Sequence, residues 1–362
     1  AVRQYAPQAN YVSGSPDCGD THYWEVWHGP KLFDAYRTQN GFLSEFGYQS
    51  FPEPKTVRAF TNASDRASVI TPVMSLHQKS GGKEANQKMV GMSLNYFHPP
   101  RGFDETLWLS QIVQGIGIKT GAEYWRQTMP RSMGCIYWQY NDTWPGMSWS
   151  SVDYFGRWKA LHYIARRFYA PLLVSGREHP ETGQADLYVS SDMRTAQKGT
   201  LKWRVTDLAG TQLRAGQQRL DIPPLASRQV QTLDLQVEVK KLGAENLLTW
   251  LALEVDGQTV SENLLFLAWP KEMALGDPGL QTHVEPGDSG YWVTLSTRRV
   301  GLWCWLELAE CDARFSDNFV HVTPDRPQKL WVKTAQPLDQ AAFTSQLLAR
   351  SLFDLGRPSP HA

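Results

Sequence analysis

The spacing of apolar residues changes near residue 175, and this change constrains the fold more than any other feature. Residues 1–175 alternate short apolar segments with amphipathic helical patterns. Residues 176–362 instead place apolar residues at every second position, between frequent turn residues. Strands that alternate with helices predict parallel strands joined by helical crossovers, whereas short strands separated by turns predict antiparallel sandwiches. The chain is therefore predicted to join an α/β part to an all-β part.

The first part contains two predicted buried strands, at residues 41–45 and 134–138. Apolar residues at helical spacing after Asp104 predict a helix between these strands, and a further helix is predicted over residues 157–169. Residues 62–104 are rich in Gly, Ser, Lys and Gln, and we expect a long loop with one short helix there.

The second part is predicted to form two immunoglobulin-like β-sandwich domains, at residues 176–275 and 276–362. The Gly-Asp-Pro-Gly sequence that begins at residue 276 predicts the link between them. Cys304 and Cys311 lie close enough in sequence to bridge a hairpin, or they are two free buried thiols. Four cysteines in all are too few for a disulfide scaffold.

The length of the first part limits its architecture. A closed (β/α)₈ barrel needs about 250 residues, and only residues 1–175 precede the predicted sandwiches. The first part is therefore either a smaller open-sheet domain or a barrel from which several N-terminal strands are missing.

Charge and motifs exclude several classes of function. The chain has 36 basic and 36 acidic side chains, which argues against nucleic acid or an anionic membrane as a partner. No apolar run approaches the ~20 residues that span a bilayer. The sequence has no GxSxG elbow, no Gly-rich phosphate loop and no HExxH pair, so we expect no cofactor and no metal.

Three segments of the first part are unusually dense in aromatic and polar residues: 19–29, 42–52 and 137–145. Aromatic rings offer flat apolar faces to the C–H faces of sugars, and the indole of Trp adds a hydrogen-bond donor. The second segment contains Glu45 at the predicted end of a strand, where catalytic groups gather in α/β barrels. Each segment alone fits a packed core and Glu45 alone fits a helix cap or an Arg pair, but three such segments together predict a sugar-binding pocket.

These segments resemble glycoside hydrolase family 2. Residues 42–52 resemble its nucleophile motif, and residues 19–29 and 138–145 resemble motifs of its β-mannosidase branch. Residues 111–126 resemble the helix before the last barrel strand, and residues 316–319 resemble a strand signature of the terminal immunoglobulin-like domain. The resemblance covers essentially the whole chain and is strongest to the animal lysosomal enzymes.

The resemblance implies that residues 1–175 are the C-terminal part of a (β/α)₈ catalytic barrel, with Glu45 as nucleophile on strand seven. It places Trp138 under the sugar, and it assigns a substrate-binding role to His22, Trp24, Trp27, Asn141 and Asp142. The general acid/base of the family is a Glu that directly follows an Asn, and no Asn-Glu pair occurs in this chain. We therefore expect the acid on a missing N-terminal half of the same polypeptide, and an inactive chain without it.

The implied function is that of a retaining exo-β-mannosidase, which removes terminal β-D-mannose from the non-reducing end of N-glycan-derived oligosaccharides in the lysosome. Asn62 begins an N-x-[ST] sequon and is an expected glycosylation site. The sequon at Asn141 falls within the expected active site, where a glycan has no room. Two alternatives stay open: another family 2 exo-glycosidase, such as a β-galactosidase or β-glucuronidase, and a glycan-binding module without catalysis.

Overall fold

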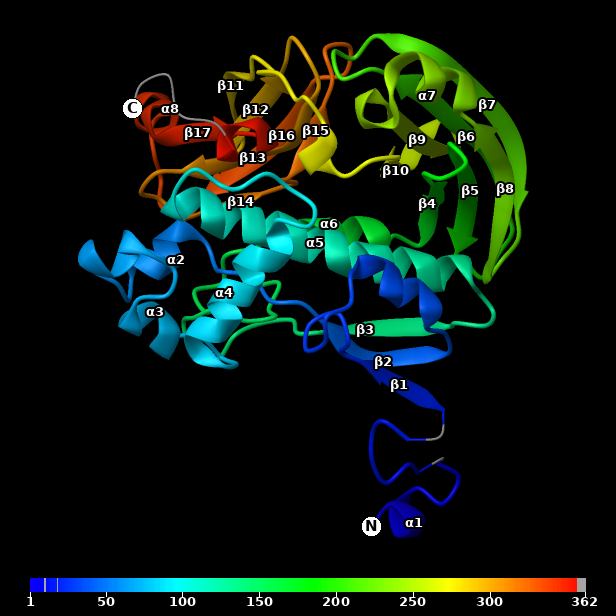
Figure 1. Ribbon diagram of the computed structural model, residues 1–362, viewed down its shortest axis with the longest axis horizontal. Coiled ribbons are helices and arrows are strands. Elements are labelled where there is room, and N and C mark those ends of the chain that lie inside the picture. The colour runs from blue at the N-terminus through cyan, green and yellow to red at the C-terminus, as the bar shows by residue number, and fades with distance from the viewer. Residues whose placement is uncertain (10, 18, 357–362) are drawn as a thin grey trace.

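The computed structural model describes residues 1–9, 11–17 and 19–356, which leaves Cys18 outside the described residues. Figure 1 shows the long helix α5 (Phe103–Gln127) between a small parallel sheet on one side and two groups of antiparallel strands on the other. No helix in the described ranges is long and apolar enough to cross a membrane.

The first part is built on a parallel sheet in the order β1-β2-β3, whose strands are β1 (Asp20–Tyr23), β2 (Phe42–Gly47) and β3 (Gly134–Trp138). Both segments predicted to be buried strands are strands, but only β2 has buried residues, whereas β3 exposes Ile136 and Trp138. Phe46 of β2 meets Trp125 of α5 edge to face, with ring centroids 4.6 Å apart, so α5 covers one face of the sheet. The predicted helices are confirmed as α5 and α6 (Ala160–Phe168).

Residues 62–104, predicted as a long loop with one short helix, contain three helices, so that prediction was only partly right. The remaining helices of the first part are α1 (Val2–Tyr5), η1 (Phe33–Thr38), α2 (Pro54–Arg58), η2 (Ser64–Ala67), α3 (Pro72–Leu76) and α4 (Gly82–Ser93). Pro72 stands in the first turn of α3, and Gly81 precedes α4 with a φ of +78°, a left-handed conformation that glycine adopts without strain. The buried face of α4 includes Asn86 and Ser93, which hid its apolar period.

The second part consists of two antiparallel sheets that share a core. One has the order β4-β5-β8 and the other the order β10-β9-β6-β7. Leu201 and Val205 are fully buried, as their alternation with polar residues predicts. The elements are β4 (Leu172–His179), β5 (Gln184–Ser191), β6 (Gln197–Thr206), β7 (Gln212–Ile222), β8 (Ala226–Asp234), α7 (Gln236–Leu242), η3 (Ala244–Asn246), β9 (Leu248–Val255), β10 (Gln258–Phe266) and η4 (Pro270–Glu272).

The third part also pairs two sheets, ordered β11-β12-β16-β14 and β15-β13-β17. Cys304 and Cys311 are free thiols, which removes the hairpin disulfide considered above. The elements are β11 (Gln281–Gly287), β12 (Gly290–Ser296), β13 (Gly301–Leu308), β14 (Ala313–Phe315), β15 (Val320–Val322), β16 (Gln328–Thr334), α8 (Gln340–Gln346), β17 (Leu347–Arg350) and α9 (Leu352–Leu355).

Strand β13 is buried on both faces, which the sequence pattern did not predict. Leu306 and Leu308 enter the core of the third part, whereas Trp305 packs on Trp108 of α5 with ring centroids 5.4 Å apart. This contact joins the last sandwich to the helix that covers the parallel sheet. The two β parts thus agree with immunoglobulin-like sandwiches, and the barrel interpretation and the domain boundaries stay predictions.

A charged cluster also joins the first part to the third. Arg157 donates to both carboxylate oxygens of Asp312 at 2.8 and 2.9 Å, and Lys55 lies 3.2 Å from the same carboxylate. Glu53 stands beside this cluster, and in the described ranges its side chain makes no hydrogen bond. Burial, reinforced by the negative charge of Asp153, raises the pKa of Glu53 to about 8.

We expect this raised pKa to make stability fall as pH rises. The folded chain retains a proton on Glu53 that the unfolded chain releases above the ordinary value of 4.5, so stability is lost between pH 4.5 and about 8. Replacement of Glu53 by Gln should flatten this decline and stabilise the chain at pH 8 by on the order of 1–3 kcal/mol. Urea unfolding of both proteins at pH 5, 6, 7 and 8 measures the pH dependence of the free energy of unfolding.

Replacement of the exposed Glu310 by Gln is the matched control and should leave the slope unchanged. An identical pH slope in the Glu53→Gln variant and in the unsubstituted chain would contradict the prediction.

Candidate active site

The parallel sheet brings the three aromatic segments to one edge. Since the strands run in the same direction, their carboxyl ends meet there. His22 of β1 is the register partner of Glu45 in β2, and Gly47 of β2 is the partner of Trp138 in β3. Segments that are far apart in sequence therefore converge around Glu45.

Glu45 presents one carboxylate oxygen to its neighbours and leaves the other free. The indole N–H of Trp24 donates to Oε1 at 3.1 Å, and Nδ1 of His22 lies 3.8 Å from the same oxygen. Across the described ranges, no hydrogen bond or ion pair engages Oε2, and no Lys or Arg pairs with the carboxylate. The side chain is 28% exposed. This geometry is not that of a helix cap or a structural Arg pair.

Asp20 organises the polar groups behind Glu45. It accepts hydrogen bonds from the hydroxyls of Ser15 and Ser44 and from the backbone N–H of Asp17, and these bonds lower the pKa of Asp20 to about 2. The same Ser15 hydroxyl lies 2.8 Å from Nε2 of His22. An ionised Asp20 thus fixes Ser15, which in turn orients the imidazole that faces Glu45.

The ring of Trp24 lies against a glycine. A Cβ on Gly47 would stand 2.8 Å from Cη2 of Trp24 and 2.5 Å from the carbonyl oxygen of Trp138, so only glycine fits there. Trp149 supports the other side of the indole, edge to face with ring centroids 6.2 Å apart. Close packing therefore sets the direction in which Trp24 donates to Glu45.

Exposed aromatic rings surround the end of β3. Trp138 is 45% exposed, Tyr140 63% and Trp144 40%, which is uncommon for rings of this size. A cis peptide bond joins Trp138 to Gln139. Such rings at a strand end beside a carboxylate offer a stacking surface for a sugar.

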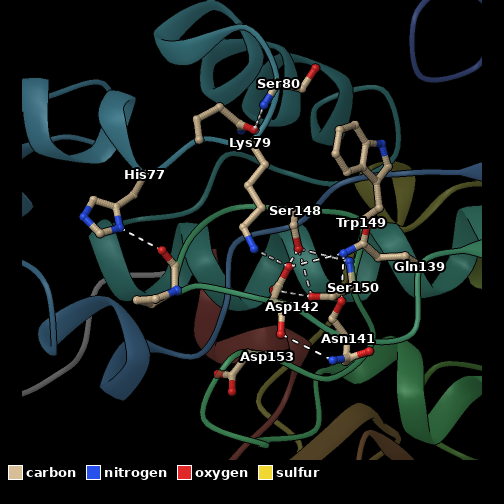
Figure 2. Close-up of polar contacts among 12 residues, drawn as sticks. His77, Lys79, Ser80, Gln139, Asn141, Asp142, Ser148, Trp149, Ser150 and Asp153 are labelled. Atoms are coloured by element: carbon tan, nitrogen blue, oxygen red, sulfur yellow. Dashed lines mark hydrogen bonds and ion pairs between the residues drawn. The ribbon is translucent and has the colours of Figure 1, made fainter.

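Two of the expected substrate-binding residues, Asp142 and Trp27, are buried. Asp142 is buried, and its carboxylate pairs with Lys79 at 2.7 Å and accepts from the hydroxyls of Ser148 and Ser150 at 2.9 and 2.6 Å (Figure 2). These partners leave no carboxylate oxygen free to bind a sugar. Trp27 is only 2% exposed, so its ring serves the core.

Asn141 and Asn62 are both exposed. The amide of Asn141 donates to the carbonyl of Asp142 at 3.3 Å, and Figure 2 shows it beside the buried polar network. Asn62 begins a turn, in which its backbone N–H is held by Asp65. An exposed Asn62 is sterically compatible with the glycan expected there.

Sequence reasoning missed Trp149 and Lys159. Trp149 stands in a run of serines, which gave no sign of its contact with Trp24. Lys159 is buried, and its ammonium donates to the carbonyls of Ser50 and Ser148 at 3.3 and 3.4 Å. Burial lowers the pKa of Lys159 to about 7. The described residues hold no group of three or more His, Cys, Asp or Glu that could bind a metal ion.

Loss of the Asp142 charge should destabilise this part strongly. The pair with Lys79 is buried, with side-chain exposures of 1% and 11%, and removal of one partner from a buried pair costs roughly 3–5 kcal/mol. We therefore expect Asp142→Asn to lower the free energy of unfolding by about 3 kcal/mol in urea titrations. Asp34→Asn breaks an exposed pair with Arg37 and should cost less than about 1 kcal/mol. Equal losses in the two variants would refute this prediction.

Comparison with known proteins supports the sequence resemblance. Residues 183–272 match the family described as a mannosidase Ig/CBM-like domain, and residues 275–355 match the Ig-fold domain of the mannosidase group. The beta-mannosidase of Bos taurus is 28% identical over 366 residues, which cover 94% of this chain and 41% of that protein. Beta-mannosidase B of Aspergillus clavatus is 25% identical over 370 residues, which cover 93% and 43%.

Solved structures agree with these relatives. The crystal structure of beta-D-mannosidase from Dictyoglomus thermophilum superposes with a TM-score of 0.81 at 25% identity, over 92% of this chain and 40% of that one. The exo-chitosanase of Amycolatopsis orientalis shares the fold, with a TM-score of 0.66 at 16% identity over 92% and 44%. The chain spans about two fifths of the length of the curated relatives named above. Over most of its length this chain is therefore similar in sequence and in fold to beta-mannosidases.

Proposed function

We propose that this chain carries the nucleophile of a retaining exo-β-mannosidase that removes terminal β-D-mannose from the non-reducing end of N-glycan-derived oligosaccharides. The observation that carries the proposal is the geometry of Glu45. Trp24 holds one carboxylate oxygen, and among the described residues the other oxygen has no partner and lies at a strand end bordered by exposed rings. The proposed roles are Glu45 as nucleophile, Trp138 as the sugar platform, and His22, Trp24 and Asn141 as substrate-side polar groups.

In this mechanism Oε2 of Glu45 attacks the anomeric carbon and forms a glycosyl ester, which water then hydrolyses. The N–H of Trp24 fixes the carboxylate rotamer, so the attacking oxygen is already oriented before the sugar binds. A second carboxyl group, about 5–5.5 Å from the first in retaining enzymes, protonates the leaving oxygen and later activates the water.

Asp20 is unsuited to the role of that second group. Its hydrogen bonds lower its pKa to about 2, so it holds no proton to donate near neutral or mildly acidic pH. We propose that the acid/base lies on an N-terminal half of the same polypeptide, which is the partner that this chain requires. The proposed compartment is the lysosome, consistent with glycosylation at the exposed Asn62.

The parallel sheet supports the proposal that residues 1–175 are part of a (β/α)₈ barrel followed by sandwiches at 176–275 and 276–362. In the described ranges β1 and β3 are edge strands that pair with β2 alone. Phe42 and Ile136 are 41% and 55% exposed on this sheet, which further barrel strands would cover.

A 2-fluoro mannoside with a good leaving group tests the nucleophile in the full-length polypeptide. The fluorine slows hydrolysis of the ester, so peptide mass spectrometry should find the label on Glu45. Glu45→Gln should abolish labelling, whereas Glu25→Gln, an exposed carboxyl nearby in sequence, should retain it. Sugar binding without any label would indicate a glycan-binding module, and efficient labelling by galactoside or glucuronide analogues alone would indicate another family 2 exo-glycosidase.

The 362-residue chain on its own should not hydrolyse an aryl β-mannoside. Without the acid/base its rate should fall by at least ~10²–10⁴ relative to the full polypeptide. Release of the aryl group by the purified chain measures this, with the Glu45→Gln variant as the background. Turnover clearly above that background would show that the chain contains its own acid and would overturn this part of the proposal.

A further inference from the structure

A cavity of about 660 Å³ lies where α5 meets the two sandwiches, and the Glu45 site contributes nothing to it. Its wall on the first part includes Ile116, Lys119 and Thr120 of α5. Figure 1 places α5 between the β1-β2-β3 sheet and the sandwiches, so the helix separates this cavity from Glu45. The volume is typical of small-molecule binding sites.

Aromatic rings from the second part form one side of the cavity. Trp250, Phe266 and Trp269 line it and are each partly exposed. The ring of Trp269 leans edge to face on Tyr96, with centroids 4.7 Å apart, and this contact holds the ring in place. Large apolar faces fixed in this way are the stacking surfaces that pyranose rings use.

Ion pairs line the remaining wall. Arg37 pairs with Glu178 at 2.9 Å, Lys119 with Glu123 at 3.1 Å, and Arg326 with Glu262 at 2.7 Å. Each pair keeps N–H donors and carboxylate acceptors that its internal bond does not use. Sugar hydroxyls donate and accept at once, so they match such paired groups.

The charge of the lining favours a neutral ligand. Its carboxylates outnumber its cations, which disfavours phosphates and other anions; the acidic side chains are Asp34, Glu123, Glu178, Glu181, Glu262, Glu272 and Asp317, and the basic ones are Arg37, Lys119, Arg167, Arg204 and Arg326. Most of these carboxylates are paired with a cation or held by a backbone N–H. In the part of the chain that the structure describes, no cluster of carboxylates is arranged for a metal ion.

We propose that this cavity is a second carbohydrate site, which binds a short neutral oligosaccharide at the junction of the three parts. Trp269 supplies the stacking face, and the paired groups on α5 and β10 supply hydrogen bonds to the hydroxyls. The site is independent of the chemistry at Glu45, because it contains no group proposed for catalysis.

Calorimetric titration of the 362-residue chain with β-1,4-linked mannotriose tests the proposal. We expect saturable binding with a dissociation constant on the order of 1 mM. Trp269→Ala should weaken it at least tenfold by removing the stacking face. Thr120→Tyr should abolish it by filling the cavity, and Trp292→Ala, which removes an exposed Trp outside the cavity, should leave it unchanged.

Circular dichroism and urea unfolding verify that each variant is folded. If the Trp269→Ala variant is unfolded, binding by the Thr120→Tyr variant tests the proposal. The absence of saturable binding would overturn the proposal, as would unchanged binding in Thr120→Tyr. Binding that survives Thr120→Tyr but is lost in Trp138→Ala would place the sugar at the Glu45 surface instead. Failure to label Glu45 in the full polypeptide bears only on the proposed function, because it leaves binding to the cavity untouched.

Discussion

The buried amide of Gln114 holds together the two loops on which the Glu45 site depends. Its N–H₂ group donates to the carbonyls of Tyr48 and Trp149 at 2.7 and 2.9 Å, and its oxygen accepts from the hydroxyl of Ser50 at 2.6 Å. A buried amide that satisfies both of its ends rigidifies what it joins. One side chain of α5 thus fixes the chain after β2 relative to Trp149, against which Trp24 leans as it donates to Glu45.

This role explains why α5 is buried around most of its surface. One side packs on the parallel sheet through Trp125, another on the last sandwich through Trp108, and its end binds the second part, where Gln127 donates to the carbonyl of Gly176 at 3.1 Å. A helix surrounded in this way carries polar residues inside, and Gln114 and Ser110 bond to the loop that follows β2. The parallel sheet and the sandwiches are therefore joined through α5.

Local periodicity predicted the elements, and contacts distant in sequence decided the rest. The sequence pattern of each segment predicts strands β2 and β3 and helices α5 and α6. Once the strands are parallel, the convergence of the aromatic segments follows as well. The role of Asp142 cannot be predicted from its local sequence, because it depends on Lys79, which is 63 residues away. The alternation of apolar residues predicted that strand β13 is half-buried, because no local pattern shows that α5 covers its second face. The burial of Trp27, which packs edge to face on Tyr48, is likewise not visible in its local sequence.

The polar groups around Glu45 suit one half of a two-carboxyl mechanism. Asp20 stays ionised because its carboxylate accepts hydrogen bonds from Ser15, Ser44 and a backbone N–H. A carboxylate that stays ionised so close to the site holds no proton to give to a leaving group. Together with the neutral donor Trp24, this arrangement orients Glu45, the proposed nucleophile, without supplying a proton. The proposed mechanism therefore requires a proton from a carboxyl whose surroundings raise its pKa, in a separate and less polar environment across the sugar.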